Sequence, residues 1–149
     1  MNKQNIPWGE VEQYLKKYIG TKVRVQSNGD IIHIGSDFPE EFAESKYTKS
    51  LRGSAAKAKA NAAQVIEEML SLAENRRWVE NKEQKHAKDA LYGWYRYDTY
   101  FGIPVQGSGE MISRTNFYRA TLVVRYSASG LYLYDVINIK KEASKPLES

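Results

Sequence analysis

The first apolar residues of the chain follow a helical period. Four of them recur every three or four positions: Trp8, Val11, Leu15 and Tyr18. This stripe predicts an amphipathic helix that covers one side of a core. Asn5 is a candidate cap, Pro7 lies near the first helical position, and Gly20 stands where a glycine commonly ends a helix.

Residues 21–35 change to an alternating pattern around Asn28-Gly29, the preferred central pair of a type I′ hairpin turn. A turn at that pair brings four apolar residues onto one face, with Val25 across from Ile32 and Val23 across from Ile34. The other face then carries Arg24 opposite His33. His33 fits an exposed strand position better than a functional one.

A polar connection, residues 36–53, follows the hairpin. It contains one predicted helical turn that ends before Ser45, with Ser36 or Asp37 as its cap and Pro39 near its start. The next segment, residues 54–74, is the clearest helix, with Ser50 or Ser54 as a candidate cap. Its predicted buried stripe is Ala55, Ala58, Ala62, Val65, Met69 and Leu72 or Ala73. The residues predicted to lie off this stripe are Lys57, Lys59, Asn61 and Gln64.

Asn75 is a predicted helix breaker, and a second helix is expected over residues 76–91. Its apolar face is sparse. Four of its polar residues share one side by spacing: Lys82, Lys85, His86 and Asp89.

From Gly93 onward the pattern is that of strands. In residues 94–101, one face carries Tyr95, Tyr97, Thr99 and Phe101, and the other carries Trp94, Arg96, Asp98 and Tyr100. Gly102 and Pro104 are expected to end this strand or to place it at an edge of the sheet.

Residues 106–116 are expected to form a loop. Strands over 117–126 and 131–140 form a hairpin with a three-residue loop, Ala128 to Gly130. Its predicted register aligns Ala120, Leu122, Val124 and Tyr126 with Tyr132, Tyr134, Val136 and Asn138. The tail, residues 141–149, is expected to fray.

Helices early and strands late predict an α+β fold, in which N-terminal helices pack on a small antiparallel sheet and an N-terminal β-hairpin is added. A chain of 149 residues fits one domain, 1–149. The net charge of +4 permits an anionic partner without demonstrating one. The absence of cysteine excludes disulfides and thiol chemistry. No apolar run is long enough for a membrane span, so no membrane partner is expected.

The sequence lacks the glycine-rich phosphate loop, the dinucleotide-binding turn, a metal-ligand spacing and a nucleophile elbow, so no cofactor and no metal are expected. Residues 82–105 concentrate the remaining candidates for acid–base chemistry: His86, Arg96, Asp98, tyrosines and tryptophans. The plainer interpretation is that the rings are core and the charges are solvated. Lys46, Lys49 and Arg52 precede the long helix, where cations and free N–H groups suit a phosphate.

Three segments carry a family resemblance: SDFPEEFAESKYTKSLRGSAAKAKANAAQVIEE, NKEQKHAKDALYGWYRYDTYFGIPV and LVVRYSASGLYLYDVINIKKEASKPL. They resemble the C-terminal domain of bacteriophage head (MuF-type) and mobile-element polyvalent proteins, which is grouped with the barnase–EndoU–colicin–RelE nuclease-like superfamily. The likeness covers residues 34–147 and leaves residues 1–33, the first helix and hairpin strand, outside. The resemblance implies a small twisted sheet and a bacterial or phage-encoded, cytoplasmic toxin domain that is delivered as part of a larger protein.

The activity that the resemblance implies is metal-independent RNA cleavage. By position, His86 is the expected general acid or base, and Arg96, Arg119 or Arg125 stabilises charge on the phosphate. Tyr95 or Tyr97 would stack or donate a proton. The residues expected to hold the RNA backbone are Lys46, Lys49, Arg52, Lys57 and Lys85. The paired histidines of the EndoU pattern are missing. The alternative hypothesis is a non-catalytic module that binds nucleic acid or a protein, such as an immunity or host protein.

Overall fold

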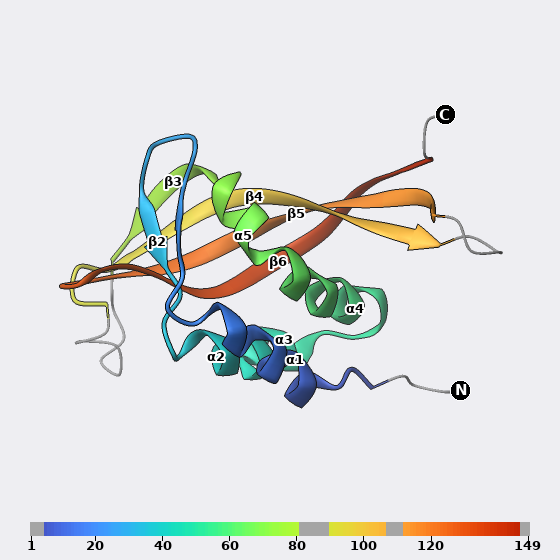
Figure 1. Ribbon diagram of the computed structural model, residues 1–149, viewed down its shortest axis with the longest axis horizontal. Helices are drawn as coiled ribbons and strands as arrows, with labels where there is room; N and C mark the ends of the chain where they lie inside the picture. Colours follow the sequence, from blue (N-terminus) through green and yellow to red (C-terminus); the bar gives the residue numbers. More distant parts are fainter. Residues whose placement is uncertain (1–4, 81–89, 107–111, 147–149) are drawn as a thin grey trace.

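The computed structural model describes residues 5–80, 90–106 and 112–146, in which short helices come first and long strands last (Figure 1). The helical elements are α1 (Trp8–Leu15), η1 (Lys16–Tyr18), α2 (Phe38–Glu44), α3 (Lys46–Ser50), α4 (Gly53–Ala62), η2 (Ala63–Val65) and α5 (Ile66–Ser71); η1 and η2 are 3₁₀ turns. The strands are β1 (Lys22–Arg24), β2 (Ile31–His33), β3 (Glu74–Val79), β4 (Trp94–Gln106), β5 (Ile112–Ser127) and β6 (Gly130–Pro146). The predicted α+β class is confirmed.

The strands of the described ranges form one sheet with the order β1-β2-β6-β5-β4-β3. Four of its neighbouring pairs are antiparallel, as predicted, whereas β2 runs parallel to β6 through Ile32 and His33. The sheet is therefore mixed, because the N-terminal hairpin joins it beside the last strand. Figure 1 shows helices α1 to α4 along one side of the three long strands, β4 to β6.

The N-terminal helix starts later than its predicted cap. It begins at Trp8 with Pro7 in the cap position, and no side chain caps it, so Asn5 does not have the predicted role. Gly20 has a φ of +93° and follows the last helical turn, as expected.

The hairpin exists, but its predicted turn and register are wrong. Val23 pairs with Ile32, and His33 lies across from Lys22 instead of Arg24. The loop is longer than a type I′ turn because the Asp30 N–H donates to the Asn28 side chain at 2.9 Å, an Asx turn. The shift amounts to two residues, so every side chain keeps its face and Val25, Ile32 and Ile34 are still buried.

Two short helices lie beside the open edge of β6. The predicted turn after Asp37 is confirmed as α2, with Pro39 in its first turn. The rest of the predicted polar connection forms a further helix, α3, whose Thr48 N–H donates to the Ser45 hydroxyl at 3.2 Å. On α3, the Tyr47 hydroxyl accepts the Ile139 N–H of β6 at 3.0 Å. Since β2 pairs with β6 only at Leu131 and Tyr132, this contact covers part of an otherwise open edge.

The long predicted helix is divided into α4, η2 and α5. Neither Ser50 nor Ser54 caps it, because α4 begins at Gly53 after Arg52. Lys59, predicted to lie off the buried stripe, is completely buried, because it lies four residues after Ala55 and three before Ala62 and so shares their side of α4. Of the two residues predicted as alternatives for the end of the stripe, Ala73 is buried and Leu72 is 51% exposed.

The predicted second helix is wrong where the structure describes it. Residues 74–79 form β3, an edge strand antiparallel to β4, and Asn75, the predicted breaker, has a φ of +57°. Residues 81–89 lie outside the described ranges. Residues 76–80 carry no helical stripe of apolar side chains, so the neighbouring strand β4 decided their conformation.

The three long strands exceed their predicted lengths, β4 at its C-terminal end and β5 and β6 at both ends. β4 continues through Gly102 to Gln106, β5 starts at Ile112, and β6 extends to Pro146, so residues 141–146 are not a frayed tail. Beyond Asp98, β4 has no partner on its β3 side, which fits the prediction that Pro104 lies at an edge. The β5–β6 loop has two residues instead of three, since Ser127 pairs with Gly130.

The predicted alternation of β4 and β5 is correct, and that of β6 is not. Bulges in the β5–β6 pairing change the register three times, so the predicted alignment of Leu122 with Val136 survives while that of Tyr126 with Tyr132 fails. In consequence, β6 sends Leu133, Val136 and Ile139 into the core. A single core cluster collects side chains from α1, the hairpin, α2, α4, α5 and the long strands. None of the helices in the described ranges is both long and apolar enough to cross a membrane.

Candidate functional site

The face of β4 and β5 that points away from the core carries exposed rings next to cations. Tyr100 of β4 lies directly across from Arg119 of β5, and Phe117 lies across from Gly102. Tyr100 is 41% exposed and Phe117 is 40% exposed, while the Arg119 side chain is 56% exposed. We call this surface the outer face.

A glycine gives the Phe117 ring its place on the outer face. A Cβ atom at Gly102 would lie 3.2 Å from the nearest atom of that ring and 3.1 Å from a Thr115 methyl carbon. The ring therefore lies against the β4 backbone at a position where a larger residue would force the ring or Thr115 to shift by a few tenths of an ångström. The Lys145 ammonium on β6 lies 5.8 Å from the ring centroid, so a cation stands beside it.

Charged side chains surround the two rings. Arg77 on β3 pairs with Asp98 at 3.1 Å, and Arg119 pairs with Glu142 at 3.2 Å. The hydrogen bond that Asn75 donates to Asp98 lowers the pKa of that carboxyl, and Arg77 and Arg119 lower it further. By strand register and these contacts, the part of the outer face that surrounds the two rings carries five cations, Arg77, Arg96, Arg119, Lys140 and Lys145, and three carboxylates, Glu74, Asp98 and Glu142. A sixth cation, Arg125, lies at the far end of the same face and is paired with Asp37.

The three arginines predicted to stabilise a phosphate all lie on the outer face, but they are spread along it. Arg119 and Arg125 are six residues apart on β5, about 20 Å in an extended strand. Arg125 pairs with Asp37 at 3.1 Å and stacks on the Tyr132 ring at 4.4 Å. Arg96 lies between them in register, and its Nε is buried without a hydrogen-bond partner among the described residues.

The two tyrosines predicted to act with these arginines point the other way. Tyr97 is completely buried in the core, and its hydroxyl donates to Asp30 at 2.6 Å. Burial, reinforced by Asp30, raises the pKa of Tyr97. Tyr95 packs against the core, with the Arg76 guanidinium 4.8 Å from its ring centroid. The structure thus does not bring Tyr95 and Tyr97 together with the arginines of the outer face.

The predicted general acid or base, His86, lies outside the described residues, as does Lys85. Their predicted roles therefore stay predictions. The other histidine, His33, is half-buried and stacks on Tyr132 with 5.1 Å between ring centroids.

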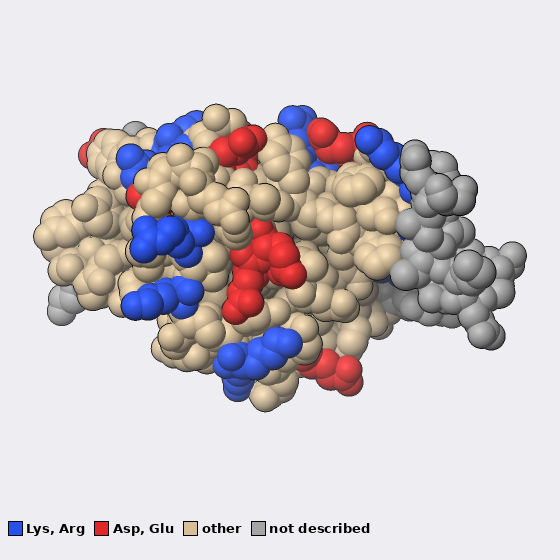
Figure 2. Space-filling view, turned by 45° about the horizontal axis from the view of Figure 1, so that its top comes forward, with Lys and Arg blue, Asp and Glu red and all other residues tan. Residues whose placement is uncertain are grey.

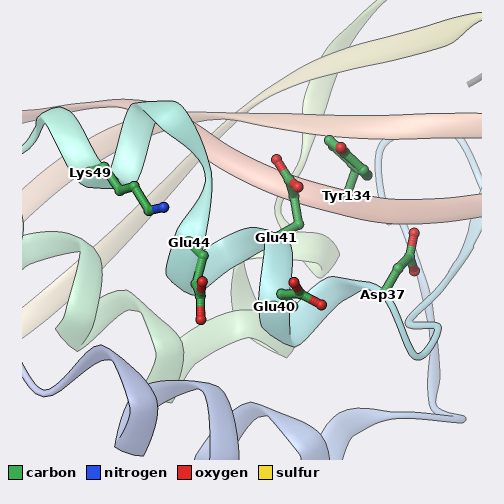
Figure 3. Close-up of a pocket in the computed structure, with 6 residues that line it drawn as sticks. All are labelled: Asp37, Glu40, Glu41, Glu44, Lys49 and Tyr134. Atoms are coloured by element: carbon green, nitrogen blue, oxygen red, sulfur yellow. The ribbon is translucent and has the colours of Figure 1, made fainter. Parts of the chain in front are cut away.

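Most of the residues predicted to hold an RNA backbone lie on or near α3, where carboxylates make the electrostatic field negative. Lys46, Lys49, Arg52 and Lys57 are exposed, as expected. Lys49, however, lines a hollow of about 400 Å³ between α2, α3 and β6 that also contains Asp37, Glu40, Glu41, Glu44 and Tyr134 (Figure 3). Arg52 donates to the carbonyls of Lys49 and Leu51, each at 2.8 Å. Four carboxylates disfavour a phosphate here, so the predicted cradle is not supported.

The sequence analysis did not predict a buried ion pair that lies behind α3. Lys59 of α4 and Asp135 of β6 are 2.7 Å apart, and the ammonium also donates to the Thr48 hydroxyl at 2.6 Å. Burial lowers the pKa of Lys59 and raises that of Asp135, and each shift is opposed by the partner. The pair has no open access to solvent, so it holds α4, α3 and β6 together and is not a binding group. Helical spacing was the available signal, because Lys59 lies four residues after Ala55 and three before Ala62, whereas the exposed Lys57 has no residue of the predicted stripe at these spacings.

On the face that Figure 2 shows, Lys and Arg side chains form separate small groups with Asp and Glu between them, and no continuous basic field is visible. Among the residues that the structure describes, no group of three or more His, Asp or Glu side chains could hold a metal ion. A scan against protein-family models, a search of curated proteins and a search of solved structures found no match to this chain.

Proposed function

We propose that this protein binds nucleic acid, with RNA as the expected class, through the outer face of β4, β5 and β6. The observation that supports this proposal is that two exposed rings, Tyr100 and Phe117, lie among five cations on one face of the sheet. Rings accept bases of any sequence, and cations neutralise phosphates and release their counterions.

The charge balance of the outer face suits moderate, salt-sensitive binding. Five cations against three carboxylates leave an excess of two positive charges. Arg119 is central because it lies directly across from Tyr100 and is more than half exposed. A phosphate would compete with Glu142 for the Arg119 guanidinium, an exchange that costs little because exposed ion pairs are weak.

Fluorescence anisotropy of a labelled RNA strand, repeated over a salt series, tests the proposal. The logarithm of the association constant is expected to fall linearly with the logarithm of the salt concentration. Arg119→Glu is expected to weaken binding about tenfold, equivalent to about 1.4 kcal/mol, and to reduce the salt slope by about 1. The matched control is Lys57→Glu, the same change of charge sign at an exposed site on α4.

Equal losses from Arg119→Glu and Lys57→Glu would show that net charge alone drives binding, and the outer face would lose its role. Absence of binding by the unaltered protein at low salt would contradict the proposal altogether. In that case a protein found by pull-down at moderate salt would favour the docking alternative.

RNA cleavage is the further activity that the sequence predicts. It rests on His86 and on the family resemblance, and it gains no support from Tyr97, whose hydroxyl is buried. Incubation with total RNA in EDTA tests it, and cleavage by the unaltered protein but not by His86→Ala is expected. Equal cleavage by both proteins, or none, would oppose the predicted role of His86.

A further inference from the structure

We infer that Tyr100 and Phe117 form a stacking platform for two adjacent unpaired bases, so that the ligand of the outer face is a single strand. This inference rests on the proposed function and names the class of ligand that the same surface takes. Its basis is the way in which the two rings are placed relative to each other and to Gly102.

The rings are diagonal neighbours on one face of an antiparallel pair. Tyr100 faces Arg119 across the ladder, and Phe117 is two residues before Arg119. Diagonal positions of this kind lie about 7–8 Å apart, within reach of aromatic side chains. Consecutive bases of an extended single strand can each cover one such ring, which is how other flat sheet surfaces hold RNA.

The ring of Phe117 lies close to the β4 strand. Its nearest ring atom lies 3.2 Å from the place where a Cβ of residue 102 would stand, so the ring packs against the strand at Gly102. At 40% exposure, Phe117 still leaves part of its surface open to a ligand. The platform is therefore built before any ligand arrives, which lowers the entropy cost of binding.

The surroundings of the rings favour a charged ligand over an apolar partner. Arg119 and Lys145 flank the two rings, and Lys140 lies across from Arg119 on β6. A protein-docking patch would present contiguous apolar area, whereas here each ring is bordered by charge. Cations beside ring faces match a strand whose phosphates alternate with its bases.

A duplex does not fit the same platform. Its bases are stacked on one another and paired, so only the backbone reaches a flat protein surface. A single strand can separate its bases and place their faces on the rings. Two kinds of contact are therefore expected. Stacking on the rings requires exposed bases, whereas contacts between the cations and the phosphates do not require them.

The test compares the unaltered protein on three labelled ligands of about ten nucleotides: a thymidine strand, an abasic strand with the same phosphates, and a duplex. The thymidine strand is expected to bind most tightly. Phe117→Leu and Tyr100→Leu should each weaken its binding between about 5-fold and 100-fold and leave the abasic strand unaffected. Tyr14→Leu is the matched control, because Tyr14 is 39% exposed but lies on α1.

Gly102→Ala tests the platform without removing a ring or a charge. The added methyl group would displace the Phe117 ring, so this variant should also lose affinity for the thymidine strand only. Circular dichroism verifies folding, and if one ring variant does not fold, the other ring variant and Gly102→Ala still decide the question.

The outcomes separate the two proposals. Equal affinity for the thymidine and abasic strands, with Arg119→Glu weakening both, would overturn the platform and leave nucleic-acid binding intact. A preference for duplex would also overturn it. If none of the three ligands binds and the labelled RNA strand does not bind either, the proposed function itself fails.

Discussion

At the scale of single residues, Lys59 shows how far residue type and final environment can differ. Its side chain is completely buried, between the Phe42 and Tyr47 rings at 4.6 Å and 5.0 Å, and it bonds to Asp135 and Thr48. A buried ammonium loses its hydration, and its interaction with the carboxylate partner offsets this desolvation cost.

Removing only the ammonium should be severe. We expect Lys59→Met to lower the free energy of unfolding by about 3–5 kcal/mol, because Asp135 is left charged and buried without its partner. The double variant Lys59→Met/Asp135→Leu should recover much of that loss. Urea denaturation measures both, with Lys57→Met as an exposed control on the same helix that should change stability by less than about 0.5 kcal/mol. A Lys59→Met protein as stable as this control would contradict the structural role of the pair.

At the scale of elements, α3 matters because it covers a strand edge. β6 is paired by β2 only near its start, and the Tyr47 hydroxyl accepts the Ile139 N–H farther along. A five-residue helix has little stability of its own, so its contacts with β6 and α4 hold it in place.

Deleting one oxygen should expose this dependence. Tyr47→Phe keeps the ring but leaves the Ile139 N–H without an acceptor, at an expected cost of about 1–3 kcal/mol. Tyr14→Phe, which removes an exposed hydroxyl on α1, is the matched control and should be nearly neutral. Chemical denaturation gives the difference, and faster hydrogen exchange at Ile139 should accompany it. If Tyr47→Phe is as stable as the control, water replaces the hydroxyl and α3 does not protect the edge.

Residues 76–79 were predicted to begin a helix and instead belong to the strand β3. The segment has four consecutive polar residues followed by Trp78 and Val79, so it carries neither a strand period nor a helical one and fits an edge strand as well as a helix surface. The segment forms a strand because its backbone pairs with that of β4. In this position the Arg76 guanidinium also packs over the Tyr95 ring. Only the availability of that partner decides such a segment.

At the scale of the whole molecule, folding raises the pKa of several tyrosines. Burial is the main cause of a raised pKa at four of them: Tyr18, Tyr47, Tyr97 and Tyr134. At Tyr100, on the outer face, a hydrogen bond to Glu74 has the same effect on the pKa. Folding therefore disfavours the phenolate form at several places at once.

The raised pKa values of these tyrosines predict that the fold is sensitive to alkali. A group whose pKa is higher in the folded state stabilises the fold below its ordinary pKa of 10.0 and loses that contribution as pH rises toward the folded value. Stability should therefore be steady near pH 8 and fall above about pH 10. Urea midpoints over this range, followed with tyrosinate absorbance, measure the effect, and Tyr97→Phe should make the decline shallower. A midpoint that stays constant through pH 11 would mean that the buried hydroxyls ionise without unfolding.

The sequence alone determined the α+β class, the existence of the hairpin and the two faces of β4, because these follow from periods of 3.6 and 2 residues that the chain carries locally. It therefore already placed Arg96 and Tyr100 on one side of the sheet and Tyr95 and Tyr97 on the other. Tertiary structure decided the rest: that Lys59 meets Asp135 in the interior, that residues 74–79 are a strand, and that Phe117 packs against Gly102. These features depend on partners from distant parts of the chain, and no local pattern records which partner a residue will meet.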